Sequence, residues 1–336
     1  MGSLFQDLIR IALQLNPRIA GTIRTVAIPG LLILFITGAR AAEISVEKSG
    51  DADAYEQIRF QNITVKNGLS YYRVRVMTQD QYGFMWFGSD FGLERFDGQN
   101  ISSFKHDPEN LNSLPLGTIT CLLSHPEQDR IWVGSRGGLC HIDIKTFQIK
   151  RIDLGPYDDI RTIAWDRDKG LWIGTQTGGL LHYDLVTLDY KIYNSNNSKI
   201  SHNQIRSIYE DVSGNLWVGT LDKLNMMDKT TGVFTAFDLK GDYDLPIQNN
   251  LILAIIPYSA RSDSLMWIGT ETGLCLFNRY TKTHRVYRKG RGNVISNDKV
   301  TSIYVADSRK IWVGTDFGLN LFDTQSETSH VYYHIP

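Results

Sequence analysis

Cysteine is scarce in this 336-residue chain, which contains three. Cys140 and Cys275 each follow a tryptophan by eight residues, so they hold the same position in two different sequence repeats and should lie far apart. Cys121 and Cys140 fall on the first and third strands expected for one sheet. Two strand spacings of about 4.8 Å separate them by about 10 Å, beyond the ~7 Å that a disulfide allows. We expect buried free thiols, and neither a disulfide framework nor a cysteine metal site.

A surplus of positive charge is also missing. The chain has 35 basic and 36 acidic residues, a formal net charge of −1. Its densest basic stretch, residues 285–291, falls between two repeats, where a solvated turn is the simpler interpretation. Because nucleic-acid binding needs lysines and arginines clustered against the phosphates, the composition disfavours a nucleic-acid partner.

Catalytic motifs are absent as well. There is no Gly-x-Ser-x-Gly elbow, His-Glu-x-x-His motif, phosphate-binding glycine loop or Cys-x-x-Cys pair. The first strand expected for each repeat is mostly apolar, as in residues 119–122 and 163–165, whereas propeller enzymes carry ligand residues there. His141 and His182 hold near-equivalent positions in adjacent repeats; a metal pair is one reading, and surface or inter-blade polar roles are the better one. We predict no enzyme activity, no metal and no cofactor.

Long apolar runs are limited to Val26–Thr37, which has the length of a signal-peptide core and is short for a membrane span. Three arginines precede it, and Ala39-Arg40-Ala41 gives a small-x-small cleavage pattern, with the mature chain starting at Ala42. An uncleaved signal anchor and a start codon placed too early are the alternatives. We predict a signal peptide or anchor over 1–41, a linker over 42–54 and an extracytoplasmic, periplasmic remainder, tethered to the inner membrane if the segment is retained.

What the chain does have is a repeat. Six tryptophans, spaced 46, 40, 45, 50 and 45 residues apart, each begin a Trp-x-Gly-Thr/Ser motif. A leucine follows each after seven or eight residues, and an aspartate or asparagine stands four residues beyond it. A period near 45 with short alternating apolar segments is typical of a β-propeller with one four-stranded blade per repeat. The six tryptophans are Trp86, Trp132, Trp172, Trp217, Trp267 and Trp312.

The fourth repeat shows the expected blade most clearly. Residues 204–209, 216–220, 224–228 and 233–237 alternate as four strands, and 210–214 form a tight turn containing Asp and Gly. The tryptophan should pack between neighbouring blades, and the glycine two residues later should allow close backbone approach or a bulge. Lys223 replaces the glycine that other repeats place between the second and third strands, which predicts a strained or locally changed loop.

The segment "GFMWFGSDFGLERFDG" (residues 83–98), the following "FKHDPENLNSLPLGTIT" and the repeated "IWVGTDFGLNLFD" (residues 311–323) closely resemble the two-component regulator propeller. This family forms the extracytoplasmic input domain of bacterial hybrid histidine kinases and of some membrane diguanylate cyclases. The resemblance extends from about residue 55 to the end. It implies a sensor whose β-sandwich, transmembrane helix and signalling module are absent from this chain, with a carbohydrate as a plausible ligand class.

We therefore predict an all-β fold, a propeller over 55–336 that is the N-terminal part of a seven-bladed or longer ring, because seven blades need about 315 residues. A closed six-bladed ring, with residues 59–65 adding a strand to the last blade, is the alternative. An open arc leaves two apolar blade faces exposed, so we expect self-association.

The polar loops that share one face of the ring form the predicted ligand site. Polar side chains there suit sugar hydroxyls, although loops are also polar simply because they are wet. The predicted function is ligand sensing, with a protein-docking propeller lacking a small ligand as the alternative. The candidate binding residues are Asp90, Arg136, Gln176, Asp222, Lys223, Glu271 and Asp316.

Overall fold

The computed structural model describes residues 31–34, 59–125, 128–168, 170–239, 251–259, 262–290 and 294–333. The signal segment, apart from residues 31–34, and the linker at 42–54 lie outside the described residues. Leu31–Leu34 forms β1, which pairs in parallel with β2 (Arg59–Asn62). In the described part of the chain, no helix has the length and apolar character needed to cross a membrane.

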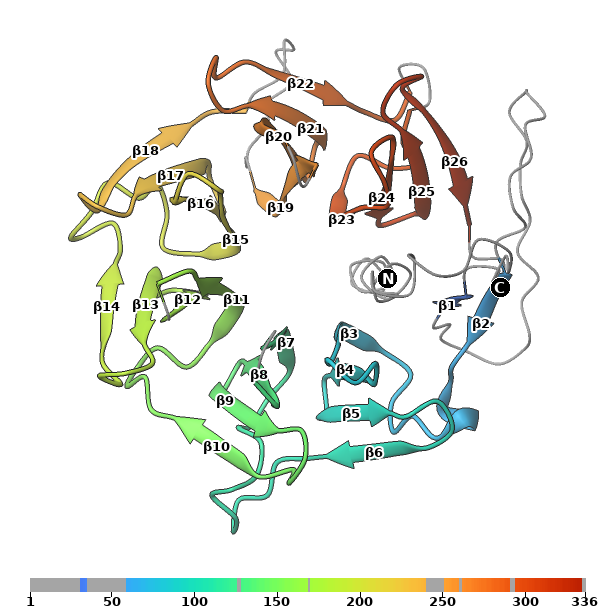
Figure 1. The fold of residues 1–336 in the computed structure, drawn as a ribbon, viewed down its shortest axis with the longest axis vertical. Coiled ribbons are helices and arrows are strands. Elements are labelled where there is room, and N and C mark those ends of the chain that lie inside the picture. Colours follow the sequence, from blue (N-terminus) through green and yellow to red (C-terminus); the bar gives the residue numbers. More distant parts are fainter. Residues whose placement is uncertain are drawn as a thin grey trace.

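The rest of the described chain forms a six-bladed propeller of antiparallel four-stranded sheets (Figure 1). A short 3₁₀ helix, η1 (Val65–Asn67), precedes the first blade. Blade 1 contains β3 (Val74–Gln79), β4 (Met85–Ser89), β5 (Leu93–Phe96) and β6 (Ile101–Phe104). Blade 2 contains β7 (Ile119–Ser124), β8 (Arg130–Ser135), β9 (Gly138–Asp143) and β10 (Ile149–Ile152). Blade 3 contains β11 (Ile160–Asp166), β12 (Gly170–Thr175), β13 (Leu180–Asp184) and β14 (Tyr190–Tyr193).

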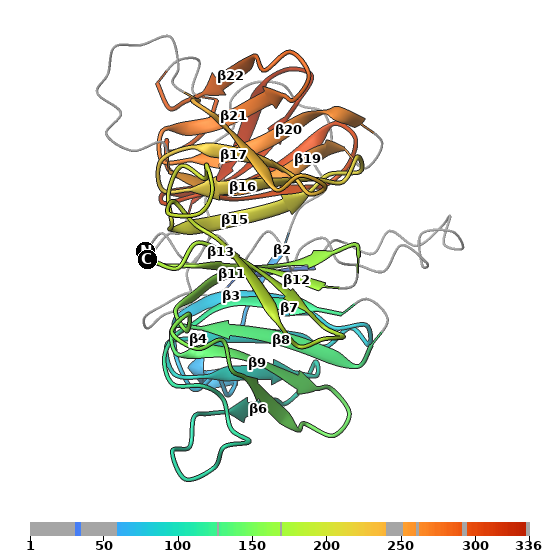
Figure 2. The ribbon, with the colours of Figure 1, turned by 90° about the vertical axis from the view of Figure 1, so that its left-hand side faces the viewer.

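Blade 4 contains β15 (Ile205–Glu210), β16 (Asn215–Thr220), β17 (Leu224–Asp228) and β18 (Val233–Phe237). Blade 5 contains β19 (Ile252–Ser259), β20 (Ser262–Thr270), β21 (Gly273–Asn278) and β22 (His284–Tyr287). Blade 6 contains β23 (Val300–Val305), β24 (Lys310–Thr315), β25 (Gly318–Asp323) and β26 (Thr328–Tyr332). The first strand of each blade lies innermost and the fourth outermost, and the blades stack side by side around the ring (Figures 1 and 2). The four strands predicted for the fourth repeat are confirmed to within one residue.

The tryptophans hold neighbouring blades together, as predicted. The five from Trp86 to Trp267 each belong to an apolar cluster that includes the first strands of the following blade. Trp86, for example, lies with Leu122, Ile131 and Ile142 of blade 2 and has no exposed surface. Burying an aromatic side chain of this size at each joint provides the main apolar contact between blades.

The glycine two residues after each tryptophan lets the next blade approach. A Cβ atom built on Gly88 would lie 2.5 Å from the Cγ2 of Ile119, at the start of blade 2. At Gly174 the same atom would lie 2.6 Å from the Cγ2 of Ile205, at the start of blade 4. Real Cβ atoms do not come this close to a packed side chain, so the expected close approach is confirmed at both positions.

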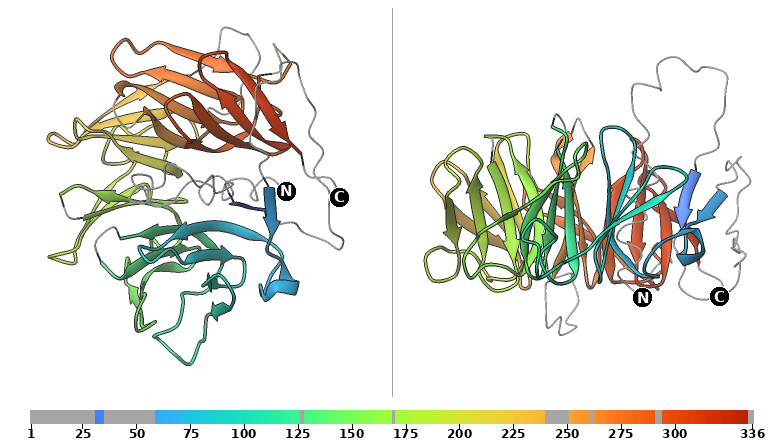
Figure 3. Two further views of the ribbon diagram at one scale, coloured as in Figure 1. Left: turned by 45° about the vertical axis from the view of Figure 1, so that its right-hand side comes forward. Right: turned by 90° about the horizontal axis from the view of Figure 1, so that it is seen from below.

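The ring is not closed in the same way between its last and first blades. Each innermost strand contacts the next along the series β3, β7, β11, β15, β19 and β23, whereas among the described residues β23 and β3 make no comparable contact. Strands β1 and β2 lie in the interval between blades 6 and 1 (Figures 1 and 3). Blade 6 keeps four strands, all its own, and β2 pairs with β1. The alternative that residues 59–65 add a strand to the last blade is therefore wrong.

Candidate functional site

The first strand of every blade contains a β-bulge at its second residue. Pairing to the second strand skips one residue each time, between Val74 and Val76 in blade 1 and at the equivalent point in the other five. A bulge leaves the extra residue outside the ladder and redirects its side chain. The six skipped residues are Arg75, Thr120, Arg161, Arg206, Leu253 and Thr301.

All six bulge residues line one central cavity of about 670 Å³, enclosed by the innermost strands of all the blades. This volume lies within the range of small-molecule sites. The bulges lie near the start of each first strand, and we call this end of the ring the entry rim. It also includes the turns between second and third strands, and one of these contributes Arg136 to the cavity wall. Deeper in the cavity the wall combines aliphatic side chains, such as Leu122 and Ile163, with hydroxyl groups, such as those of Thr162 and Ser207.

Two of the cavity arginines have carboxylate partners. The guanidinium of Arg75 binds both oxygens of Asp90, with Nη2 3.2 Å from Oδ2, and the Thr118 hydroxyl donates to the same carboxylate at 3.1 Å. Arg161 donates from Nη2 to Oδ2 of Asp159 at 3.1 Å. Forked contacts of this kind fix the direction of each guanidinium at the mouth of the cavity.

The other two arginines of the cavity, Arg136 and Arg206, have no such partner among the described residues. Among the described residues, no carboxylate lies within ion-pair distance of Arg136 or Arg206. Arg206 faces the amide oxygen of Gln204 when that side chain takes the orientation that satisfies its hydrogen bonds. Burial lowers the pKa of Arg206; the charges of Arg161 and Arg136 lower it further, whereas those of Asp159 and Glu271 raise it. Burial and the charge of Arg136 likewise lower the pKa of Arg161. The entry rim therefore brings Arg136, Arg161 and Arg206 close together, with Asp159 and Glu271 as the carboxylates near them.

The predicted binding residues lie at this rim, although only Arg136 lines the described cavity wall. In four blades the residue after the Gly-Thr/Ser motif donates its backbone amide to the carbonyl of the residue before the first strand, as Arg136 does to Thr118 at 3.0 Å and Gln176 to Asp159 at 2.9 Å. Asp90 does not line the cavity itself, but its carboxylate binds Arg75, which does. Glu271 and Asp316 share Lys299, at 3.9 and 3.5 Å.

Asp222 and Lys223 lie on the turn between β16 and β17, 3.9 Å apart, with their side chains 49% and 37% exposed. Lys223 replaces a glycine without strain, because it is not among the residues with positive φ, whereas glycines at the same position are, such as Gly92 at 148°. Its amide donates to the Thr220 hydroxyl at 3.0 Å. The turn has changed locally, which was one of the two alternatives.

Arg75, Arg161 and Arg206 were missed by the sequence analysis. The description of the first strands as mostly apolar holds for their paired residues and is wrong for the bulge position in these three blades. A signal was present, since arginine follows the first apolar residue of the strand in V-R-V, I-R-T and I-R-S. The alternation of apolar and polar residues along the strand does not by itself predict that this residue faces the cavity, because only the bulge turns its side chain there.

The two histidines have structural roles. His141 and His182 stand directly across the strand pair from Trp132 and Trp172, with ring centroids 5.1 and 4.3 Å apart. His182 also lies 2.6 Å from a carboxylate oxygen of Asp166. No group of metal-ligating side chains occurs among the residues that the structure describes. The three cysteines are buried and free, as predicted.

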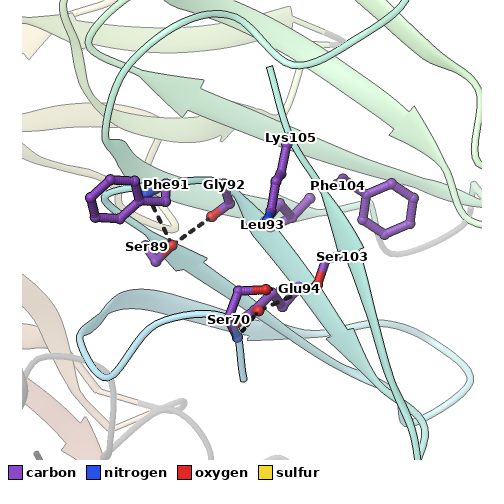
Figure 4. A pocket seen from close by; sticks show the side chains of 9 residues that line it. All are labelled: Ser70, Ser89, Phe91, Gly92, Leu93, Glu94, Ser103, Phe104 and Lys105. Carbon is purple, nitrogen blue, oxygen red and sulfur yellow. Dashed lines mark hydrogen bonds between the residues drawn. The ribbon is translucent and has the colours of Figure 1, made fainter. Parts of the chain in front are cut away.

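A second, minute cavity of about 10 Å³ lies on blade 1 around Glu94 (Figure 4). The buried Glu94 accepts the Ser70 amide at 2.5 Å, while its other oxygen has no partner. Asn225 and Asn320 accept the amides of Ser201 and Ser296 at equivalent positions of blades 4 and 6, at 3.0 and 2.8 Å. This cavity holds a loop-anchoring contact and has no room for a ligand.

Comparison with known proteins supports the repeat assignment. Residues 155–177 and 199–222 match the family described as "Two component regulator propeller". No curated protein matches the chain.

Solved structures share the fold. The extracellular domain of the hybrid two component system BT4673 from B. thetaiotaomicron has a TM-score of 0.65 and 22% identity over 78% of this chain and 33% of that one. Virginiamycin B lyase from Staphylococcus aureus has a TM-score of 0.58 and 12% identity over 77% of this chain and 83% of that one. This chain thus spans about a third of the extracellular domain that it resembles. Two segments of this chain match the two component regulator propeller family, which confirms the resemblance found in the sequence.

Proposed function

We propose that this propeller is an extracytoplasmic sensor domain that binds a small ligand at the entry rim and passes the signal to an output module outside this sequence. The observation that carries the proposal is the central cavity, into which four consecutive blades direct arginines. Fixed, partly desolvated polar groups around a pocket of this size are typical of ligand sites. The fold shared with an extracellular domain of a hybrid two component system supports the location and the sensory role.

The proposed role is binding without catalysis. The arginines at the rim can hold and orient a ligand, and a guanidinium group stays protonated near neutral pH, which makes it unsuited to proton transfer there. Virginiamycin B lyase shares the fold at 12% identity, which brings no activity to this chain.

We also propose that the complete ring has a seventh blade, of which β2 is the outermost strand. β2 (Arg59–Asn62) precedes Ser70 by the same number of residues as β14 (Tyr190–Tyr193), the outermost strand of blade 3, precedes Ser201. Ser70 and Ser201 hold equivalent places, because the amide of each is bound by a side chain at the start of a third strand, Glu94 and Asn225. By this spacing β2 corresponds to the outermost strand of a seventh blade. The three inner strands of that blade are not among the described residues.

The tryptophan clusters agree with an extra blade. Among the described residues, Trp312 of blade 6 belongs to no inter-blade cluster, and the cluster of blade 1 contains no tryptophan. Trp312 is only 5% exposed, and an added blade would give it the inter-blade apolar cluster that the other five tryptophans have.

The alternative function is docking of a second copy without a small ligand. Phe91 and Phe317 occupy the same turn position on the two blades that flank the interval, and they are 59% and 64% exposed. Exposed aromatic side chains at an open edge favour association.

Thermal unfolding of the full chain in the presence of a panel of neutral and acidic saccharides separates the two functions. A ligand that binds the folded state raises the melting temperature with concentration, and Arg136→Ala should abolish the shift. Docking instead predicts that no saccharide changes the melting temperature, while light scattering shows a concentration-dependent dimer that Phe317→Ala weakens; that pair of results would contradict the sensor proposal.

A further inference from the structure

We infer that the entry rim recognises an oxyanion: a carboxylate, sulfate or phosphate group carried by a small molecule that enters the central cavity, held by Arg136, Arg161 and Arg206. This inference rests on the proposed ligand-sensing function and specifies the ligand's chemistry.

The placement of the guanidinium groups is the first argument. Blades 1, 3 and 4 contribute Arg75, Arg161 and Arg206 from their bulges. In blade 2 the bulge residue is Thr120, whose hydroxyl donates to the backbone oxygens of Ile160 and Gly134 at 2.6 and 3.1 Å. Arg136, on the neighbouring turn, supplies the charge there instead. Four consecutive blades thus form a cationic arc, and the bulges of blades 5 and 6 carry Leu253 and Thr301.

The second argument is the charge balance. Asp90 and Asp159 pair with Arg75 and Arg161, which leaves the charges of Arg136 and Arg206 without carboxylate partners among the described residues. Like charges in a partly desolvated cavity repel one another, and the repulsion is stronger there than in bulk water. The pKa of Arg206 is lowered by burial and then by Arg161 and Arg136, and the more distant carboxylates of Asp159 and Glu271 offset this only in part. A bound oxyanion would offset the repulsion and accept charge-assisted hydrogen bonds.

The third argument is the local structure that holds Arg161 and Arg206 in place, while Arg136 lies on an exposed turn beside them. The side chain of Arg161 is only 12% exposed. The bulge fixes where each first-strand arginine leaves the ladder, and Gln204 and Asp159 fix the direction of two of them. A solvated surface arginine needs none of these contacts. Guanidinium groups that are ordered before binding lose less entropy when they bind an anion.

The wall below the arginines sets a limit on the rest of the ligand. It carries aliphatic side chains, such as Leu122 and Ile163, and hydroxyl groups, which include those of Thr162, Ser207 and Ser302. A small organic anion can place its acidic group at the rim and a body with both apolar and hydroxyl groups against this wall, whereas an extended polyanion cannot enter a cavity of about 670 Å³.

Isothermal titration calorimetry of the purified full chain tests the inference with glucose, glucuronate and sulfate as probes. We expect glucuronate or sulfate to bind in low salt and glucose to bind at least about tenfold more weakly, because a charge-assisted hydrogen bond contributes about that factor. Arg136→Ala and Arg206→Gln should each weaken anion binding about tenfold, and high salt should weaken it as well.

Arg130→Ala is the matched control. Arg130 begins the same strand, β8, whose other end leads to Arg136, so its loss removes one charge from the opposite end of the ring. It should leave the anion affinity unchanged. Arg136 lies on an exposed turn, so its replacement should not prevent folding.

Equal affinities for glucose and glucuronate, with both lost in Arg136→Ala, would overturn the anion inference and leave the sensor proposal intact. If Arg130→Ala weakened anion binding as much as Arg136→Ala does, the anion would be held by non-specific charge attraction, and the anion inference would also be overturned. Absence of sulfate and glucuronate binding at millimolar concentration would reject the inference, whereas the sensor proposal would then depend on the wider saccharide panel.

Discussion

The guanidinium of Arg279 in blade 5 lies 2.5 Å from Oδ2 of Asp211 in blade 4, and the same oxygen accepts the indole N–H of Trp217 at 2.8 Å. Both charged side chains are buried, with 4% and 1% of their surfaces exposed. Asp211 also accepts the amides of Ser213 and Asn215, so it closes the turn before β16. One carboxylate therefore holds a turn, orients a core tryptophan and ties two blades together.

Replacing Arg279 with alanine should destabilise the chain by about 3–5 kcal/mol, because it leaves the Asp211 carboxylate buried without its counter-charge. Urea unfolding at neutral pH measures the change. Arg285→Ala is the control: Arg285 pairs with Glu327 on the surface, 63% exposed, and its loss should cost less than about 1 kcal/mol. Similar costs for the two variants would show that Asp211 does not depend on Arg279.

His141 should make stability depend on pH. Burial, followed by the charges of Arg130 and Lys150, lowers its pKa from 6.5 to about 4. Between these values the unfolded chain binds a proton that the folded chain does not, so stability falls as the pH decreases from 6.5 towards 4. The loss between pH 7 and pH 5 should be about 1 kcal/mol, after a discount for the half-exposed ring.

The replacement His141→Leu should remove this dependence, because leucine occupies the equivalent place opposite Trp267 and Trp312, as Leu276 and Leu321. Urea unfolding at pH 7 and pH 5 compares the two proteins, and an NMR titration of His141 reports its pKa directly. An unchanged difference between pH 7 and pH 5 in the variant would assign the effect to other groups.

Glu94→Gln should leave the chain as stable as before or increase its stability by about 1 kcal/mol. The amide oxygen can still accept the Ser70 N–H, and the change removes a buried carboxylate oxygen that has no partner. Asparagine already performs this task at positions 225 and 320.

Glu94→Ala is the comparison variant, because it removes the side-chain acceptor altogether. It removes the acceptor of the Ser70 amide and should cost about 2 kcal/mol in thermal or urea unfolding. If Glu94→Gln were as damaging as Glu94→Ala, the negative charge itself would have a role that the anchoring contact does not explain.

Sequence reasoning found the features that recur and missed those that vary. Tryptophan and glycine at fixed spacing predicted the blades because each repeat needs the same joint to its neighbour. The bulge position has no residue type common to all six blades, since its occupant ranges from Arg161 to Leu253, so the three arginines there did not stand out as part of the repeat. The alternation therefore could not show which first-strand residue enters the cavity.

Side-chain contacts between blades could not be predicted from the sequence either. Asp166 and Asp211 begin similar turns, yet Asp211 accepts the Trp217 indole whereas Asp166 binds His182 and, from blade 4, Lys229. The Trp172 indole N–H has no partner. Which bond forms depends on a side chain more than 60 residues away in blade 4, and local sequence patterns carry no information about it.

The last prediction concerns the open end of the ring. Trp267 packs among Val300, Ile303 and Ile311 of blade 6, and its replacement by alanine should cost about 3–5 kcal/mol. Trp312 is 5% exposed, has a ring contact with Tyr332 of its own blade, centroids 5.6 Å apart, and belongs to no inter-blade cluster among the described residues. Trp312→Ala should therefore cost about half as much, measured by urea unfolding of the full chain. Trp217→Ala is the control and should match Trp267→Ala, since Trp217 packs against blade 5. Equal costs for all three would mean that Trp312 already has a packed neighbour in this chain, which would argue against a seventh blade.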